Sequence, residues 1–104
     1  MQIGDILVGG YFCGCCGCEN YYFVKVTEIT HRTVEYRFLH SKEVKIRQGV
    51  ALLTPLGINE NCSEDASTIL HDAQGDYIKR ESFGGDNVYI MRRWDGKPVE
   101  IITV

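Results

Sequence analysis

Apolar and polar residues alternate along most of this chain, and short turn signals separate the alternating runs. Val34-Glu35-Tyr36-Arg37-Phe38 shows the pattern, which places every second side chain on the same face of a strand. Gly75-Asp76, Gly84-Gly85-Asp86 and Asp95-Gly96 supply residues that tolerate a positive φ in tight turns. Because this period suits strands and not helices, the sequence predicts an all-β fold.

The alternating runs predict eight short strands. They cover residues 3–12, 20–30, 33–40, 43–54, 67–73, 76–81, 87–94 and 98–103. The segment from Thr54 to Ala66 contains proline, glycine and asparagine without any periodicity, so we expect an ordered loop there. Trp94-Asp95-Gly96-Lys97-Pro98 predicts a tight hairpin turn that joins the last two strands.

The composition is that of an ordinary globular domain. The chain has 104 residues, of which 44% are hydrophobic and 24% are charged, so one core of modest size is expected. Small sheets of several short strands often remove their exposed edges by closing on themselves. We therefore expect residues 1–104 to form a single domain, a small SH3-like or related closed β-barrel of short antiparallel strands.

Charge and hydropathy exclude several partner classes. The formal net charge of -3 argues against a nucleic-acid surface, because duplex binding depends on lysine and arginine placed against phosphates. The doublets Lys79-Arg80 and Arg92-Arg93 are short, and we expect them on solvated strand faces. No apolar run is long enough to span a bilayer, and the first residues lack the regions of a signal peptide. The sequence predicts a cytoplasmic protein without a nucleic-acid or membrane partner.

Four of the five cysteines lie together in Cys13-Gly14-Cys15-Cys16-Gly17-Cys18. The flanking residues are rich in β-branched and aromatic side chains, so this segment is predicted to be the end of a β-hairpin. A symmetric turn then places Cys13 opposite Cys18 and Gly9 opposite Tyr22. In that register a tyrosine ring covers the bare backbone of a strand glycine, or the glycine marks a bulge or bend.

The sequence leaves three uses of these thiols open. Cys13, Cys15, Cys16 and Cys18 are candidate ligands of one soft ion, zinc or copper(I), because the adjacent glycines let the backbone fold thiolates inward. Against this, structural zinc sites usually take their ligands from two separated knuckles. The alternatives are reduced thiols that contact a partner, and a disulfide between Cys13 and Cys18 or between Cys15 and Cys16. Cys62 has no sequence partner, and we expect it to fill packing space.

The sequence predicts no enzyme activity and no catalytic residues. A cysteine nucleophile needs a positioned base, and nothing in the sequence ties one thiol to one of the three histidines. We expect His31, His40 and His71 at surface or packing positions. The glycines beside the cysteines belong to a hairpin and are not followed by a phosphate-binding helix.

Four short motifs near the two ends of the chain carry a family resemblance. They are Gly4-Asp5-Ile6, Tyr11 at the start of a loop, Tyr21 followed by Val24-Lys25-Val26-Thr27, and the closing Trp94-Asp95-Gly96-Lys97-Pro98. With these motifs the chain resembles an uncharacterised family of small proteins encoded by bacteriophages and related mobile elements. The family's loop is polar and aromatic where this chain has Cys13 to Cys18. The resemblance implies a small β-barrel and an accessory role in binding a host protein, such as a defence or regulatory factor.

Two functional hypotheses follow. In the first, the protein is a non-enzymatic phage or prophage accessory protein that binds a host macromolecule. Tyr11, Tyr21 and Tyr22 are then the candidate partner-binding residues, because aromatic side chains supply contact area at low entropic cost. In the second, the protein is a metal-binding module that uses its cysteine loop.

Overall fold

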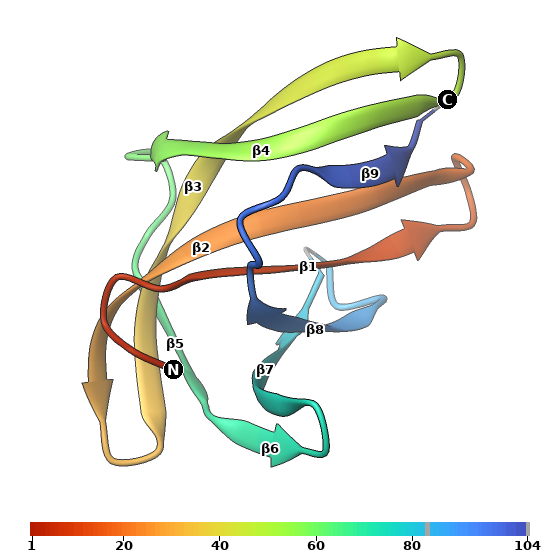
Figure 1. The fold of residues 1–104 in the computed structure, drawn as a ribbon. Helices are drawn as coiled ribbons and strands as arrows, with labels where there is room; N and C mark the ends of the chain where they lie inside the picture. The colour runs from red at the N-terminus through yellow and green to blue at the C-terminus, as the bar shows by residue number, and fades with distance from the viewer. Residues whose placement is uncertain (83, 104) are drawn as a thin grey trace.

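A computed structural model describes residues 1–82 and 84–103 of the chain. These residues form nine strands and no helix, which confirms the predicted all-β fold. The strands are β1 (Ile6–Cys13), β2 (Cys18–Thr30), β3 (Thr33–Arg47), β4 (Val50–Ile58), β5 (Asp65–Thr68), β6 (Leu70–Asp72), β7 (Gly75–Glu81), β8 (Val88–Arg93) and β9 (Val99–Ile102), as Figure 1 shows. Within the described ranges, therefore, no helix could cross a membrane.

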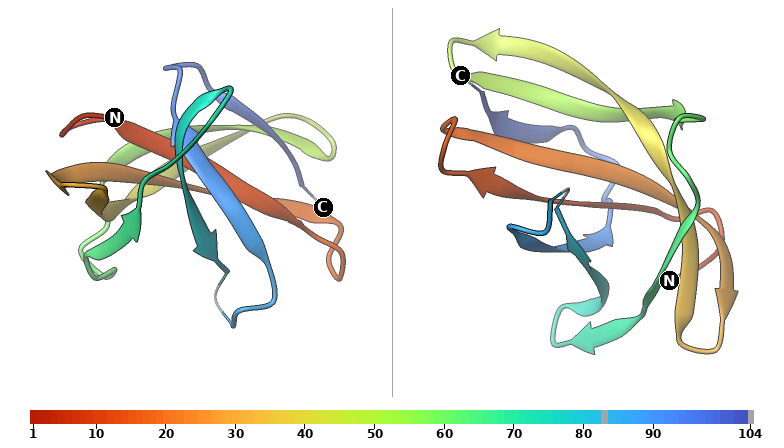
Figure 2. Two further views of the ribbon diagram at one scale, coloured as in Figure 1. Left: turned by 90° about the horizontal axis from the view of Figure 1, so that it is seen from below. Right: turned by 180° about the vertical axis from the view of Figure 1, so that it is seen from behind.

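The described strands pair in the order β6-β7-β8-β1-β2-β3-β4-β9, and β5 pairs separately with β3. Strand β3 is shared, because its first half pairs with β2 and β5 whereas its second half pairs with β4. Strands β2 and β3 consequently diverge beyond the Val24–Phe38 pair. Strands β4 and β9 lie along β1 and β2 on the side away from β7 and β8, as Figures 1 and 2 show.

The sheet curls without closing, so the prediction of a closed barrel is wrong. Among the described strands, β7 pairs only with β6 and β8, and β5 pairs only with β3. Strand β6 occupies the beginning of the outer edge of β7, from Gly75 to Tyr77. Further along, a side-chain contact replaces the backbone ladder, because Arg80 of β7 forms an ion pair with Asp65 of β5 at 2.5 Å. The result is an open, curled half-barrel, and its assignment to the SH3-like class stays a prediction.

Both faces of hairpin β1–β2 are covered, because alternate residues pack into two different hydrophobic clusters. The first cluster lies inside the curl and consists of Leu7, Val24, Val26, Val34, Tyr36, Phe38, Ile78, Tyr89 and Met91. The second lies between the hairpin and strands β4 and β9, and consists of Phe23, Ala51, Leu53 and Ile101. Full burial of a side chain such as Leu7 contributes roughly 1.5–3 kcal/mol, so both layers help to fix the hairpin.

The register of the first hairpin is confirmed, since Cys13 lies opposite Cys18 and Gly9 lies opposite Tyr22. The strand glycines are explained by the close approach of neighbouring backbones. A Cβ atom on Gly9 would overlap the carbonyl oxygen of Ile90 in β8 and lie 2.8 Å from its carbonyl carbon. A Cβ atom on Gly10 would lie 2.7 Å from the Cα atom of Tyr21. Both positions therefore require a residue without a side chain.

Hairpin β3–β4 turns later than predicted. Strand β3 continues through Ser41 to Arg47, and the turn lies at Gln48 and Gly49, where Gly49 has a φ of 78°. Pro55 belongs to strand β4 and not to the predicted loop. Strand β4 pairs with β9 only as far as Leu53, so the missing N–H group of Pro55 interrupts no bond to β9.

The predicted hairpin between the last two strands is wrong. Strand β8 pairs with β1 and β7, whereas β9 pairs with β4. Trp94 anchors the crossing, because its ring packs edge-on against Phe23 at 5.8 Å and its backbone N–H donates to the Ile6 carbonyl at 2.7 Å. Its indole N–H donates to the Lys97 carbonyl at 2.6 Å. The segment thus connects β8, which pairs with β1 and β7, to β9, which pairs with β4.

Candidate functional site

The end of hairpin β1–β2 carries four thiols that solvent can reach. Cys15 and Cys16 are exposed, Cys13 and Cys18 are half-buried, and none of the four is in a disulfide. The Gly17 N–H donates to the Cys13 carbonyl at 2.9 Å, and Gly17 has a φ of 71°. A glycine at this position lets the chain reverse without strain.

The four thiols interact with one another. The Sγ atoms of Cys16 and Cys18 lie 2.9 Å apart. A hydrogen bond from the Cys16 thiol, together with backbone N–H groups of Cys16 and Cys15, lowers the pKa of Cys13 to about 7. Hydrogen bonds with Cys18 and Cys13 raise the pKa of Cys16 to about 11. The turn therefore holds a thiol that ionises near neutral pH beside one that keeps its proton.

The described residues contain no group of three or more histidine, cysteine, aspartate or glutamate side chains arranged to hold a metal ion. A zinc or copper(I) site at Cys13, Cys15, Cys16 and Cys18 therefore stays a prediction. Cys62 lies between β4 and β5 and packs against the first hydrophobic cluster, as expected of a packing residue.

The three candidate tyrosines divide between the two faces of the hairpin. Tyr11 and Tyr22 pack against the cluster inside the curl, whereas Tyr21 packs against the second cluster. The ring centres of Tyr11 and Tyr22 are 6.5 Å apart, and they lie 5.7 and 5.8 Å from the ring of Tyr89. Tyr22 also meets Phe38 edge-on at 6.2 Å. We call Tyr11, Tyr22, Tyr89 and Phe38 the aromatic row.

Two tyrosines of the aromatic row, Tyr22 and Tyr89, have raised pKa values. Burial, followed by a hydrogen bond with Tyr11, raises the pKa of Tyr22 to about 12. Burial also raises the pKa of Tyr89, although the nearby Arg80 opposes the shift. By strand alternation, Cys13 lies on the same face of the hairpin as Tyr11.

A hollow of about 450 Å³ adjoins the row beside the gap between β5 and β7. It is lined by Phe38, Asn61, Cys62, Ser63, Glu64, Asp65 and Arg80. The Arg80 guanidinium lies 4.8 Å from the centre of the Phe38 ring, within the range of a cation–π interaction. Its Nη1 donates to the carboxylate of Asp65 at 2.5 Å and to the hydroxyl of Tyr36, and its Nε donates to the hydroxyl of Tyr89 at 3.3 Å. Within the described ranges Nη2 has no protein partner, so its two N–H groups are available to a ligand.

Sequence reasoning missed Arg80 as a site residue, because it treated the Lys79-Arg80 doublet as a solvated strand face. Lys79 is exposed, but only 14% of the Arg80 side chain is. Burial disfavours the Arg80 cation, yet hydrogen bonds to Asp65 and two tyrosines outweigh it and raise its pKa. The signal that could have found Arg80 is alternation, since it stands two residues after the buried Ile78.

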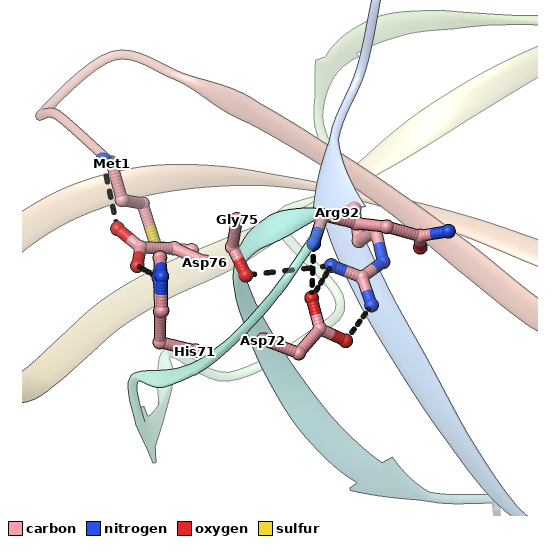
Figure 3. A network of polar contacts seen from close by, with 7 residues as sticks. Met1, His71, Asp72, Gly75, Asp76 and Arg92 are labelled. Atoms are coloured by element: carbon pink, nitrogen blue, oxygen red, sulfur yellow. Dashed lines mark hydrogen bonds and ion pairs between the residues drawn. The ribbon is translucent and has the colours of Figure 1, made fainter.

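A second hollow, of about 340 Å³, lies beside the β6–β7 turn, and Figure 3 shows its polar contacts. Arg92 donates two hydrogen bonds to the Asp72 carboxylate, at 2.5 and 3.0 Å. Asp76 accepts a hydrogen bond from the Met1 amino group at 3.4 Å and contacts the ring of His71 at 3.0 Å. Both carboxylates are committed to cationic groups, so this network ties the turn to β8 and to the start of the chain.

No protein-family model, curated protein or solved structure matches this chain. The resemblance to small phage proteins therefore stays a prediction. What bears on function is the geometry of the thiol loop, the aromatic row and the adjoining hollow.

Proposed function

We propose that this protein is a non-enzymatic binding module that recognises another protein through the aromatic row and the hollow beside Arg80. The observation that carries the proposal is the half-buried pair Tyr11 and Tyr22, held by ring contacts next to an arginine with unused donors. Tyrosine and arginine are the residue types that dominate binding energy in protein interfaces. Because neighbouring rings already order these side chains, little rotamer entropy is lost when a partner binds.

The charges around the hollow favour a polypeptide over a nucleic acid. Glu64 and Asp65 line the hollow together with Arg80, and the whole chain carries a net charge of -3. Two carboxylates at the site would repel phosphates, which nucleic acids present at every nucleotide. A peptide segment offers backbone carbonyls to the Nη2 of Arg80 and apolar side chains to Phe38. The site therefore suits a protein partner.

The same proposal includes the origin of the partner, which we expect to be a bacterial host. The resemblance to phage and mobile-element proteins is the reason to expect a cytoplasmic protein of a bacterial host. Such a partner could be a defence or regulatory factor whose activity changes when this module binds.

We expect Tyr11→Ala to weaken partner binding at least tenfold, which corresponds to about 1.4 kcal/mol of binding free energy. The substitution removes one ring of the aromatic row and leaves Tyr22 packed against Tyr89 of the first hydrophobic cluster. The partner is first captured from bacterial lysate on the immobilised wild-type protein, then identified and purified. Titration calorimetry with the purified partner measures the change in affinity.

Tyr21→Ala is the matched control, because it removes the same side chain from the opposite face of the same hairpin. We expect its affinity to stay within about twofold of wild type. Thermal unfolding of both variants shows that they are folded at the temperature of the measurement. A loss of binding in Tyr21→Ala with none in Tyr11→Ala would place the contact on the other face. Capture of nucleic acid alone would contradict a protein partner.

A further inference from the structure

The second half of β3 is an open strand edge. Strand β2 leaves β3 after the Val24–Phe38 pair, and from Leu39 to Arg47 β3 pairs only with β4 among the described strands. All residues from His40 to Arg47 are exposed, and Figures 1 and 2 show this part of β3 along the outside of the molecule. Such an edge presents unpaired N–H and C=O groups with which a further strand can form a ladder.

The open edge also carries an apolar side chain near its middle. Val44 is 46% exposed and pairs with the half-buried Leu52 of β4. Directly paired residues lie on the same face of a sheet, so Leu52 and Val44 form an apolar row that stops at the edge. The ladder with β4 is regular from Ser41 to Lys45, so this part of β3 has the shape that a further strand requires. An added strand with an apolar residue opposite Val44 would continue the row.

The charges along this edge are complementary to themselves. Val44 stands between Glu43 and Lys45. When two copies of the edge run antiparallel with Val44 opposite Val44, Glu43 of each copy lies opposite Lys45 of the other. Opposite charges at directly paired positions stabilise a strand pair, and like charges there destabilise it. A register centred on Glu43 or on Lys45 would place two like charges opposite each other, so the charges favour the register centred on Val44.

We propose that the protein forms a homodimer in which the β3 edges of two copies pair antiparallel about Val44. The pairing has twofold symmetry and occupies the open edge of both copies, so the assembly closes at two chains. Strand β9, at the other end of this layer, meets β2 instead, where the Ile102 N–H donates to the Glu19 carboxylate at 2.9 Å. The paired edge contains no residue of the aromatic row or of the hollow beside Arg80, so the dimer is independent of the partner proposed above.

Sedimentation velocity over a range of protein concentrations tests the dimer. We expect wild-type protein to form a species of twice the mass of the chain as its concentration rises. Glu43→Lys places two pairs of lysines opposite each other, and Lys45→Glu places two pairs of glutamates opposite each other. Each change alone should raise the Kd of the dimer at least tenfold. An equimolar mixture of the two variants should form a heterodimer with a Kd within about twofold of the wild-type value, because both charge pairs are again opposite in sign.

Glu81→Lys and Lys79→Glu are the matched controls, because they make the same charge changes at exposed positions of β7, outside the paired edge. Their Kd should stay within about twofold of wild type, since neither changes a cross-strand pair of the dimer. Wild-type protein that is monomeric at every concentration would overturn the proposal. So would a mixture of Glu43→Lys and Lys45→Glu that stays monomeric, or control variants that dissociate as readily as these two. Circular dichroism of each variant shows that a lost dimer does not come from a lost fold.

Discussion

Gly9→Ala is expected to lower the free energy of unfolding by at least about 3 kcal/mol. The new methyl group would overlap the carbonyl oxygen of Ile90 and lie 2.9 Å from the Cα atom of Met91. Both neighbours are backbone atoms of β8, so no side chain can rotate away to make room. Strand β8 would have to move off β1, and the side chains of Tyr89 and Met91 would leave the first hydrophobic cluster with it.

Urea denaturation measures the effect, and thermal unfolding should show a fall in Tm of about 12 °C or more for a domain of this size. Gly57→Ala is the matched control, because Gly57 also lies in a strand and a Cβ atom there meets nothing within 4 Å. We expect that variant to stay within about 0.5 kcal/mol of wild type. Equal stabilities of the two variants would mean that β8 does not lie against Gly9.

The first hairpin was predictable because its determinants are local. A six-residue turn flanked by alternating apolar residues permits one symmetric register, and Cys13 lies opposite Cys18 as that register requires. Alternation also divides the tyrosines, since Tyr21 and Tyr22 are neighbours on one strand and must point to opposite faces. The turn at Gln48-Gly49 also has a local signal, a glycine after a polar residue. The polar residues Ser41 and Lys42 resemble the end of a strand, so the sequence predicts the turn too early.

Whether the sheet closes depends on contacts between distant segments, which the sequence does not encode locally. Asp95-Gly96 is a good turn signal, yet β9 pairs with β4 and not with β8, and Trp94 packs against Phe23 where the chain crosses. The hollow beside Arg80 likewise exists because β5 approaches β7 without pairing with it. Neither its depth nor its lining could be predicted from a segment of sequence alone.

Arg80→Met is expected to lower the free energy of unfolding by about 2 kcal/mol at neutral pH. Methionine keeps an apolar stem beside Phe38 but removes the hydrogen bonds to Asp65, Tyr36 and Tyr89, which link β7 to β5, β3 and β8. Each lost hydrogen bond contributes roughly 0.5–1.5 kcal/mol. About half of the Asp65 side chain is exposed, so screening by water limits the ion-pair contribution to at most about 1 kcal/mol.

The pH dependence of the stability lost in Arg80→Met distinguishes the loss of the Arg80–Asp65 ion pair from a loss of packing. Although burial opposes it, the hydrogen bond from Arg80 holds the pKa of Asp65 below its ordinary value of 3.8. A carboxyl group with a lowered folded-state pKa stabilises the fold above its unfolded pKa, and this contribution is lost as the pH falls through the folded pKa. The difference in the free energy of unfolding between wild type and Arg80→Met should therefore be largest at pH 7 and smaller below pH 3.8. Urea denaturation at pH 7 and at a pH below 3.8 measures it. Lys79→Met, the same change at the exposed neighbouring position, should stay within about 0.5 kcal/mol of wild type at both. If Arg80→Met is as stable as Lys79→Met at pH 7, the contacts of Arg80 do not stabilise the packing of β5 beside β7.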